Sequence, residues 1–192
     1  MHVRDPLDLL PLRQMVAASG DAAPVLARQD LLDRLSRPDR YRIVGRGNRG
    51  QILAASELAL AEARVLLRQA YGDLLTFGAT SVHSYVDPQT ETPMVPVLFV
   101  RIDAPRAHRR DLLDILKGRR ADLKDVETQR DRVVLRAELE FSRALGLQRE
   151  VLELADGSAH FLSWLLEYRR AGSGTDLASD RSHAGNNKRV NA

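Results

Sequence analysis

The order of structural patterns in residues 95–169 restricts the possible folds of this chain more than any other feature. An apolar run closed by proline comes first, then a basic amphipathic segment, two strand patterns around a polar turn, a second amphipathic segment and a last apolar strand. The predicted elements are strand 96–105, helix 106–118, strands 122–128 and 132–141, helix 142–154 and strand 158–168. This order predicts an α+β fold, the ferredoxin-like split βαβ sandwich (βαββαβ).

The rest of the sequence divides into three further regions. Residues 1–23 predict an N-terminal extension, and residues 24–93 predict a smaller, helix-rich α+β region that precedes the ferredoxin-like domain at 94–169. The strongest helix of that region is expected at 51–71, because this segment is rich in Ala, Leu, Glu and Arg. Residues 170–192 consist mainly of small and polar residues with scattered charges, a composition that predicts a disordered tail. No internal repeat stands out.

Composition excludes several classes of protein. The chain of 192 residues contains no cysteine, so disulfides and thiolate metal sites are excluded. No apolar run approaches the roughly 20 residues of a membrane-spanning helix, and the acidic, proline-interrupted start is unlike a secretory signal. We therefore expect a cytoplasmic protein. Lys and Arg number 29 against 26 Asp and Glu, a net charge of +3 that permits RNA binding without requiring it.

Residues that could carry catalysis do not form an active-site pattern. The five histidines lack the spacing of a zinc site, and the serines lack the turn that exposes a nucleophile. Glu138 and Glu140 alternate with apolar residues, which is typical of a solvated strand face rather than of a pair of glycosidase carboxylates. We therefore expect no enzymatic activity, no metal site and no cofactor.

The glycine-rich segment 45–50 (GRGNRG) is a candidate phosphate contact through Arg46 and Arg49. Backbone N–H groups of glycines and the N-terminus of a following helix can bind phosphate. The segment is not a nucleoside triphosphate loop, because Gln51 and Ile52 follow its last glycine where that loop needs Lys and Ser or Thr. Two interpretations remain, a strand-to-helix turn with solvated arginines and a contact to RNA backbone.

Basic side chains cluster around the predicted helix 106–118. They are Arg106, His108, Arg109, Arg110, Lys117, Arg119 and Arg120, and Asp111 and Asp114 offset them in part. Such a cluster is either a solvated helix face or a surface that binds the phosphates of ribosomal RNA.

Six short segments occur in the order and at the spacing of a known domain. They are VRIDAP (100–105), KGRR (117–120), AEL (137–139), LGL (145–147), ADG (155–157) and LEYR (166–169). In this arrangement the chain resembles the last domain of translational GTPases of the elongation factor G and BipA/TypA type. Upstream, residues 41–47 and 80–93 are similar to the preceding small domain of BipA-like factors and to its connection with the last domain.

The resemblance implies a ribosome- or rRNA-binding module that lacks the GTPase domain and modulates translation. The residues it implies for ribosome contact are Arg109, Arg110, Arg119 and Arg120, with Arg46 and Arg49 secondary. The sequence departs from the family pattern at Glu140, Leu152, Ala155 and Asp156. Because these departures replace family residues, the alternative function is a protein–protein interaction or homo-oligomerisation module.

The sheet face opposite the helices is expected to be open and apolar. Strand alternation, aligned to the family, places on it Val97, Phe99, Leu162, Trp164, Leu166 and Tyr168. A contiguous apolar patch of this kind rarely stays uncovered. Three interpretations remain for what covers this patch. Residues 24–71 of the same chain could pack on it, or unpaired RNA bases could stack on its aromatic rings. In the third, a protein partner or a second copy binds Phe99, Leu162, Trp164, Leu166 and Tyr168.

Overall fold

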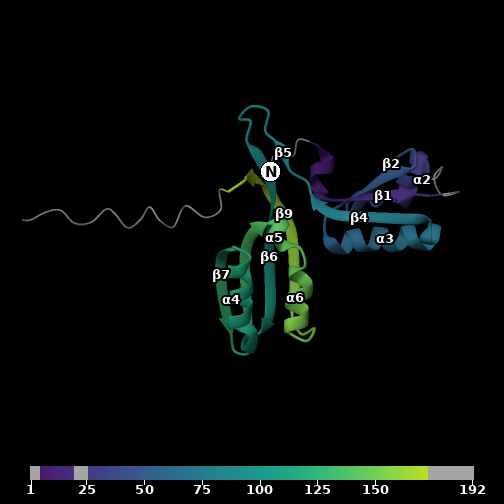
Figure 1. Cartoon of the computed structure of the whole chain (residues 1–192). Helices are drawn as coiled ribbons and strands as arrows, with labels where there is room; N and C mark the ends of the chain where they lie inside the picture. Colours follow the sequence, from purple (N-terminus) through teal and green to yellow (C-terminus); the bar gives the residue numbers. More distant parts are fainter. Residues whose placement is uncertain (1–4, 20–25, 173–192) are drawn as a thin grey trace, which may run out of the picture.

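The computed structural model describes residues 5–19 and 26–172, which form two antiparallel sheets with helices packed on them (Figure 1). The C-terminal half, residues 93–172, contains the elements predicted from the sequence. They are β6 (Pro93–Pro105), the 3-10 helix η4 (Arg106–His108), α4 (Arg109–Gly118), β7 (Asp122–Gln129), β8 (Arg132–Glu140), α5 (Phe141–Ala144), α6 (Leu147–Leu154) and β9 (His160–Arg170). The split βαβ prediction is confirmed here, whereas the tail predicted beyond residue 172 lies outside the described residues.

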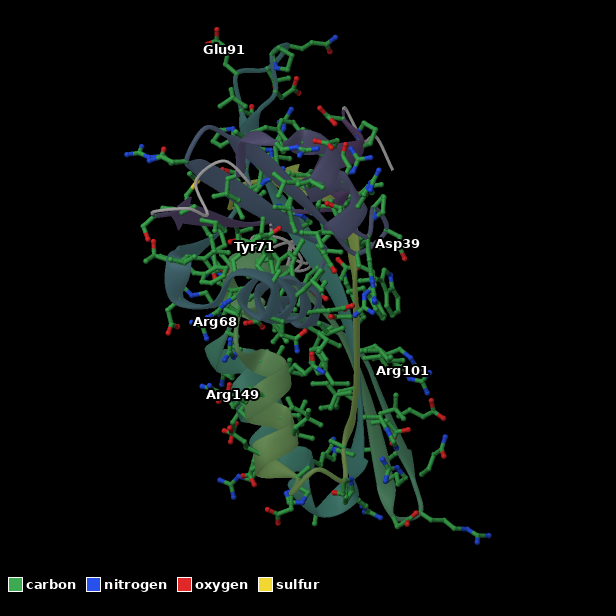
Figure 2. The ribbon with its side chains drawn as sticks, turned by 90° about the vertical axis from the view of Figure 1, so that its right-hand side faces the viewer. Asp39, Arg68, Tyr71, Glu91, Arg101 and Arg149 are labelled. Carbon is green, nitrogen blue, oxygen red and sulfur yellow. The ribbon has the colours of Figure 1, made fainter. Side chains whose placement is uncertain are left out.

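The central strand of the second sheet is β6. It pairs antiparallel with β8 on one side and with β9 on the other, β7 continues the sheet beyond β8, and the short β5 (Tyr85–Val86) pairs with the first residues of β6. Val100, Ile102 and Ala104 are fully buried in the core that α4 and α6 share, whereas Arg101 is exposed on the opposite side. Both helices cover one face, as Figures 1 and 2 show, so the other face is open as predicted.

The second predicted helix, 142–154, is divided in two. Between α5 and α6, Gly146 adopts the left-handed conformation with a φ of 75°. Glycine enters this region without the steric cost that a Cβ brings. The N–H of Gly146 also donates to Glu57 Oε2 at 2.9 Å, so the break in the helix is a point of contact with the N-terminal half.

The N-terminal half, residues 5–82, has the same topology as the C-terminal half. Its elements are the 3-10 helix η1 (Pro6–Leu9), β1 (Leu12–Ala18), α2 (Gln29–Leu35), β2 (Tyr41–Arg46), β3 (Arg49–Ala54), α3 (Glu57–Tyr71), the 3-10 helix η3 (Gly72–Leu74) and β4 (Leu75–Val82). The strand order β2-β3-β1-β4 matches the order β7-β8-β6-β9 position by position. The described chain thus contains two βαββαβ units. The topology repeats, although the sequence shows no recognisable repeat.

The prediction of an N-terminal extension at 1–23 is wrong for β1, which is an interior strand between β3 and β4. The buried residues of β1 alternate as expected for a strand, but the polar Gln14 occupies one of the buried positions. Its side-chain Nε2 donates to the Gly78 carbonyl oxygen at 2.8 Å. A hydrogen-bonded polar residue in the core therefore concealed the strand pattern.

The helix predicted at 51–71 begins later, at Glu57. The residues before it pair with β1 and β2 as strand β3, although Ala and Leu favour a helix there. Pairing within the sheet overrides local propensity. Ser56 fixes the start of α3, because its hydroxyl oxygen accepts a hydrogen bond from the N–H of Ala59 at 3.2 Å.

Residues 45–50 belong to the β2–β3 hairpin, so the strand-to-helix turn is a wrong interpretation. The pairing register sets Gly45 opposite Gly50. A strand follows the segment, so the helix N-terminus expected to assist phosphate binding is not present there. Gly45 is required by packing, because a Cβ at this position would lie 1.9 Å from the Leu26 carbonyl oxygen.

Tyr168 of β9 joins the two halves. Its hydroxyl donates to the Asp8 carbonyl oxygen at 3.0 Å, and the centroid of its ring lies 5.0 Å from that of Tyr85. Burial raises the pKa of Tyr168, and the nearby Asp8 carboxylate raises it further, so the hydroxyl remains a donor. One apolar cluster contains buried residues of both halves.

We expect Gly45→Ala to lower the free energy of unfolding by about 1 to 3 kcal/mol, the usual cost of an added group in a filled site. The new methyl group would overlap the backbone of Leu26, which no side-chain rotation can relieve. Urea denaturation measures the change. Gly118→Ala is the control, because a Cβ there meets nothing within 4 Å. Equal loss of stability in both variants would contradict the packing described for Gly45.

Candidate functional site

One candidate surface lies on the helical side of the C-terminal half. This surface, named the α4 surface, consists of Arg106, Arg109 and Arg110, which are all exposed. Within residues 5–19 and 26–172, none of the three takes part in an ion pair. Their charges stand at a helix N-terminus, where the helix dipole disfavours a cation by about 0.3 to 1 kcal/mol. Asp111 and Asp114 on the same helix are also exposed and offset part of the positive charge.

Arg119, which the resemblance implies as a ribosome contact, is engaged in hydrogen bonds within the chain. Its guanidinium donates to the carbonyl oxygens of Arg143 at 2.6 Å and Leu145 at 2.9 Å. It also donates twice to the Glu150 carboxylate, at 3.1 and 2.7 Å. These bonds tie the end of α4 to the break between α5 and α6, so most donors of Arg119 are already used.

The other predicted arginines do not lie together. Arg120 is exposed, but α4, which has 10 residues and is about 15 Å long, separates it from the α4 surface. Arg49 is exposed in the β2–β3 hairpin, whose tip lies near the end of α3 remote from the C-terminal half, about 22 Å along that helix. Arg46 belongs to β2, and its side chain lies outside the described part of the structure.

The second candidate surface is the apolar patch on the open face of the sheet, formed by Phe99, Leu162 and Trp164. Phe99 and Trp164 are opposite each other in the pairing of β6 with β9, and their rings stack with centroids 4.7 Å apart. Trp164 is 49% exposed and Leu162 is 57% exposed. The expectation that residues 24–71 cover this patch is therefore wrong.

A β-bulge removes Tyr168 from the apolar patch. Two consecutive residues of β6 are opposite Leu165 and Glu167, so Leu166 is an extra residue in β9. Past such a bulge the side chains change faces. Tyr168 consequently turns toward the N-terminal half, where it is buried. The prediction that Tyr168 lies on the open face is wrong, because it continued a regular alternation through the bulge.

The charged groups around the apolar patch form ion pairs with one another. Ion pairs join Arg132 to Asp103, Arg136 to Asp125 and Glu127, Lys124 to Asp122 and Glu138, and Arg169 to Glu138 and Glu167. Hydrogen bonds from Gln129 and Arg136 lower the pKa of Glu127, so this carboxylate stays ionised. Six carboxylates share four cations in these pairs, an excess of negative charge that does not attract RNA phosphates.

Arg101 is the exception on the open face, and the sequence analysis did not single it out. It lies between Leu162 of β9 and Arg136 of β8 in the pairing register. It points away from the helices (Figure 2), and among the described residues it forms no ion pair. The signal was present in the sequence, since an arginine within an otherwise apolar central strand must face solvent.

A hollow beside the open face adds no separate site. It is lined by Val95, Val97, Arg120, Asp122, Glu138, Leu139, Glu140, Arg143, Arg169, Arg170 and Gly172. Charges of both signs pair across it, as Arg143 does with Glu140 at 3.5 Å. Among the described residues, no group of three or more His, Asp or Glu is placed to hold a metal ion. In the same residues, every helix is too short or too polar to cross a membrane.

We expect Arg119→Ala to lower the free energy of unfolding by about 1 to 2 kcal/mol, because it leaves two carbonyl oxygens and the Glu150 carboxylate without their donor. Arg120→Ala is the matched neighbour and is expected to change stability by less than about 0.5 kcal/mol. Thermal or urea unfolding of both variants tests this. If Arg119→Ala is as stable as wild type, Arg119 is not the structural tie described.

Comparisons with known proteins identify the fold and not the function. Neither the protein-family models nor the curated proteins match this chain. Among solved structures, the chain is similar to a protein of Thermus thermophilus, with 12% identity and a TM-score of 0.54. The likeness covers 84% of this chain and 41% of the other, so the chain spans less than half the length of that protein. At this identity, the similarity establishes a shared fold alone.

Proposed function

We propose that this protein is a non-catalytic module that binds the ribosome or ribosomal RNA through the α4 surface, and that it modulates translation in the cytoplasm. The observation that carries the proposal is a group of three exposed arginines near the start of α4 that have no carboxylate partners among the described residues. Guanidinium groups bind phosphate through forked hydrogen bonds, and RNA presents phosphates in a series along its strand.

The position of these charges supports an anionic partner. The dipole of α4 disfavours cations at its first turn, and neither Arg109 nor Arg110 gains an ion pair within the described chain in compensation. A phosphate bound there would pair with the guanidinium groups and would also interact favourably with the helix N-terminus. A partner with a polyanionic backbone therefore offsets both the missing ion pairs of the arginines and their unfavourable interaction with the helix dipole.

The resemblance to the last domain of translational GTPases points to the same class of partner. The strand order and the placement of both helices on one face agree with the fold that the resemblance implies. The proposed set of contact residues differs from the set that the sequence implied. Arg106, Arg109 and Arg110 are primary, Arg120 is secondary, and Arg119 takes no part because its donors are used internally.

A second candidate function is protein–protein interaction through the apolar patch. The observation that favours it is the exposure of Leu162 and Trp164, which no part of the described chain covers. The paired charges around the patch suit a protein partner better than stacked RNA bases, because the phosphates of RNA would meet an excess of carboxylates. The two candidate functions use opposite sides of one sheet, so different substitutions separate them.

We expect Arg109→Ala combined with Arg110→Ala to weaken binding to ribosomal subunits by about ten- to a hundredfold, from a loss of about 1 kcal/mol or more per guanidinium. Fewer counterions would be released, so the slope of log affinity against log salt should fall by about 1.5 to 2. Co-sedimentation with subunits at several salt concentrations measures both quantities.

The control is Arg28→Ala combined with Arg34→Ala, which removes the same charge from exposed positions in the N-terminal half. This control should lose little affinity and keep its salt slope. Trp164 provides a second readout, because it is the only tryptophan in the chain. RNA bound at the α4 surface should leave its emission unchanged. Equal effects of the two double substitutions, or quenching of Trp164 by RNA, would contradict the proposal.

A further inference from the structure

The two outer edges of the second sheet are built differently. The edge strand β7 carries Asp122, Lys124, Asp125 and Glu127 and contains a pairing irregularity, features that prevent an edge from pairing with another chain. The opposite edge strand, β9, has no charge, proline or glycine in its segment 161–166 (FLSWLL). Sheets that leave one long apolar edge unprotected expose it to another strand.

No strand of the described chain pairs with the outer edge of β9, whose recorded partner is β6 alone. Figure 2 views the molecule from this side, and β9 runs along the edge with α6 to its left. The backbone N–H and C=O groups along the outer edge of β9 can therefore form hydrogen bonds with a further strand. Leu162 and Trp164, the most exposed members of the apolar patch, stand on the same strand.

We propose that the occupant of this edge is a second copy of the chain, whose β9 pairs antiparallel with the first about a two-fold axis at Ser163. The proposal rests on the protein-interaction candidate and is independent of the α4 surface. A two-fold interface requires a surface that is complementary to itself. β9 meets this requirement because its regular, apolar part, residues 161–165, is centred on Ser163 and ends where the bulge begins.

The pairing register follows from the faces of the strand. Opposed residues of an antiparallel pair lie on the same face, so the sum of their numbers must be even here. Centring on Ser163 opposes Leu162 with Trp164 and Phe161 with Leu165, so every side chain from 161 to 165 other than the central serine meets an apolar one. Centring on Trp164 would instead oppose Ser163 with Leu165 and would extend the pairing into the bulge at Leu166.

This arrangement also explains why the apolar patch can be exposed in one copy. Both open faces lie on the same side of the combined sheet, so the Phe99–Trp164 stacks of two copies approach across the axis. Two patches that are each incomplete then form one continuous apolar surface, with Trp164 of each copy against Leu162 of the other.

A single engineered cysteine tests the register, because the chain contains no cysteine of its own. Residues directly opposite in a strand pair have Cβ atoms about 4.5 to 5.5 Å apart, close to the separation that a disulfide needs. Under a mild oxidant, Ser163→Cys is expected to form covalent dimers several-fold faster than Val65→Cys, which is 54% exposed on α3.

The mass of the wild-type chain, measured by analytical ultracentrifugation, should rise toward a dimer with concentration, with a blue shift of Trp164 emission. Trp164→Glu should remain monomeric, whereas Leu58→Glu, at a site 61% exposed on α3, should dimerise like wild type. A dimer that Trp164→Glu dissolves but Ser163→Cys does not trap would overturn edge pairing and leave an interaction of the open face standing. A monomer at all concentrations would overturn the proposal. It would also exclude a second copy of the chain as the partner in the proposed protein–protein interaction.

Discussion

The one extra residue in β9 determines what each part of that strand does. Before the bulge, alternation places Leu162 and Trp164 on the open face, and after it the same alternation turns Tyr168 toward the N-terminal half. A regular strand would carry the Tyr168 hydroxyl away from its bond with Asp8. The chain thus obtains a contact between its halves and an exposed aromatic pair from a single strand, and the bulge is the constraint on which both depend.

The two sides of the second sheet satisfy their charges in different ways. On the open face, carboxylates and cations other than Arg101 pair with one another, and the apolar patch is left uncovered within the described chain. On the helical side, apolar residues are buried and arginines at the start of α4 are left without carboxylates among the described residues. An anionic partner and an apolar partner would therefore be recognised at separate places, which allows both to be bound at once.

Local pattern predicted the order of elements in the C-terminal half, because alternation in β8 and amphipathic spacing in α4 and α6 stand between clear turns. It failed where distant parts of the chain decide the outcome. Gln14 conceals β1 because its partner, the Gly78 carbonyl, comes from a strand far along the sequence. In the sequence Arg119 resembles a surface arginine, because the carbonyl oxygens that accept its hydrogen bonds belong to a distant segment, α5 and the residue after it. Tyr168 was misplaced because a bulge is a property of two paired strands, and one strand alone does not show it.

Hydrogen–deuterium exchange of the full chain with and without ribosomal subunits tests the central claim, that two separate surfaces serve two kinds of partner. The account predicts slower exchange at residues 106–120 when subunits are added, while exchange at residues 161–166 depends on the protein concentration alone. Slower exchange at 161–166 on addition of subunits, with none at 106–120, would contradict it.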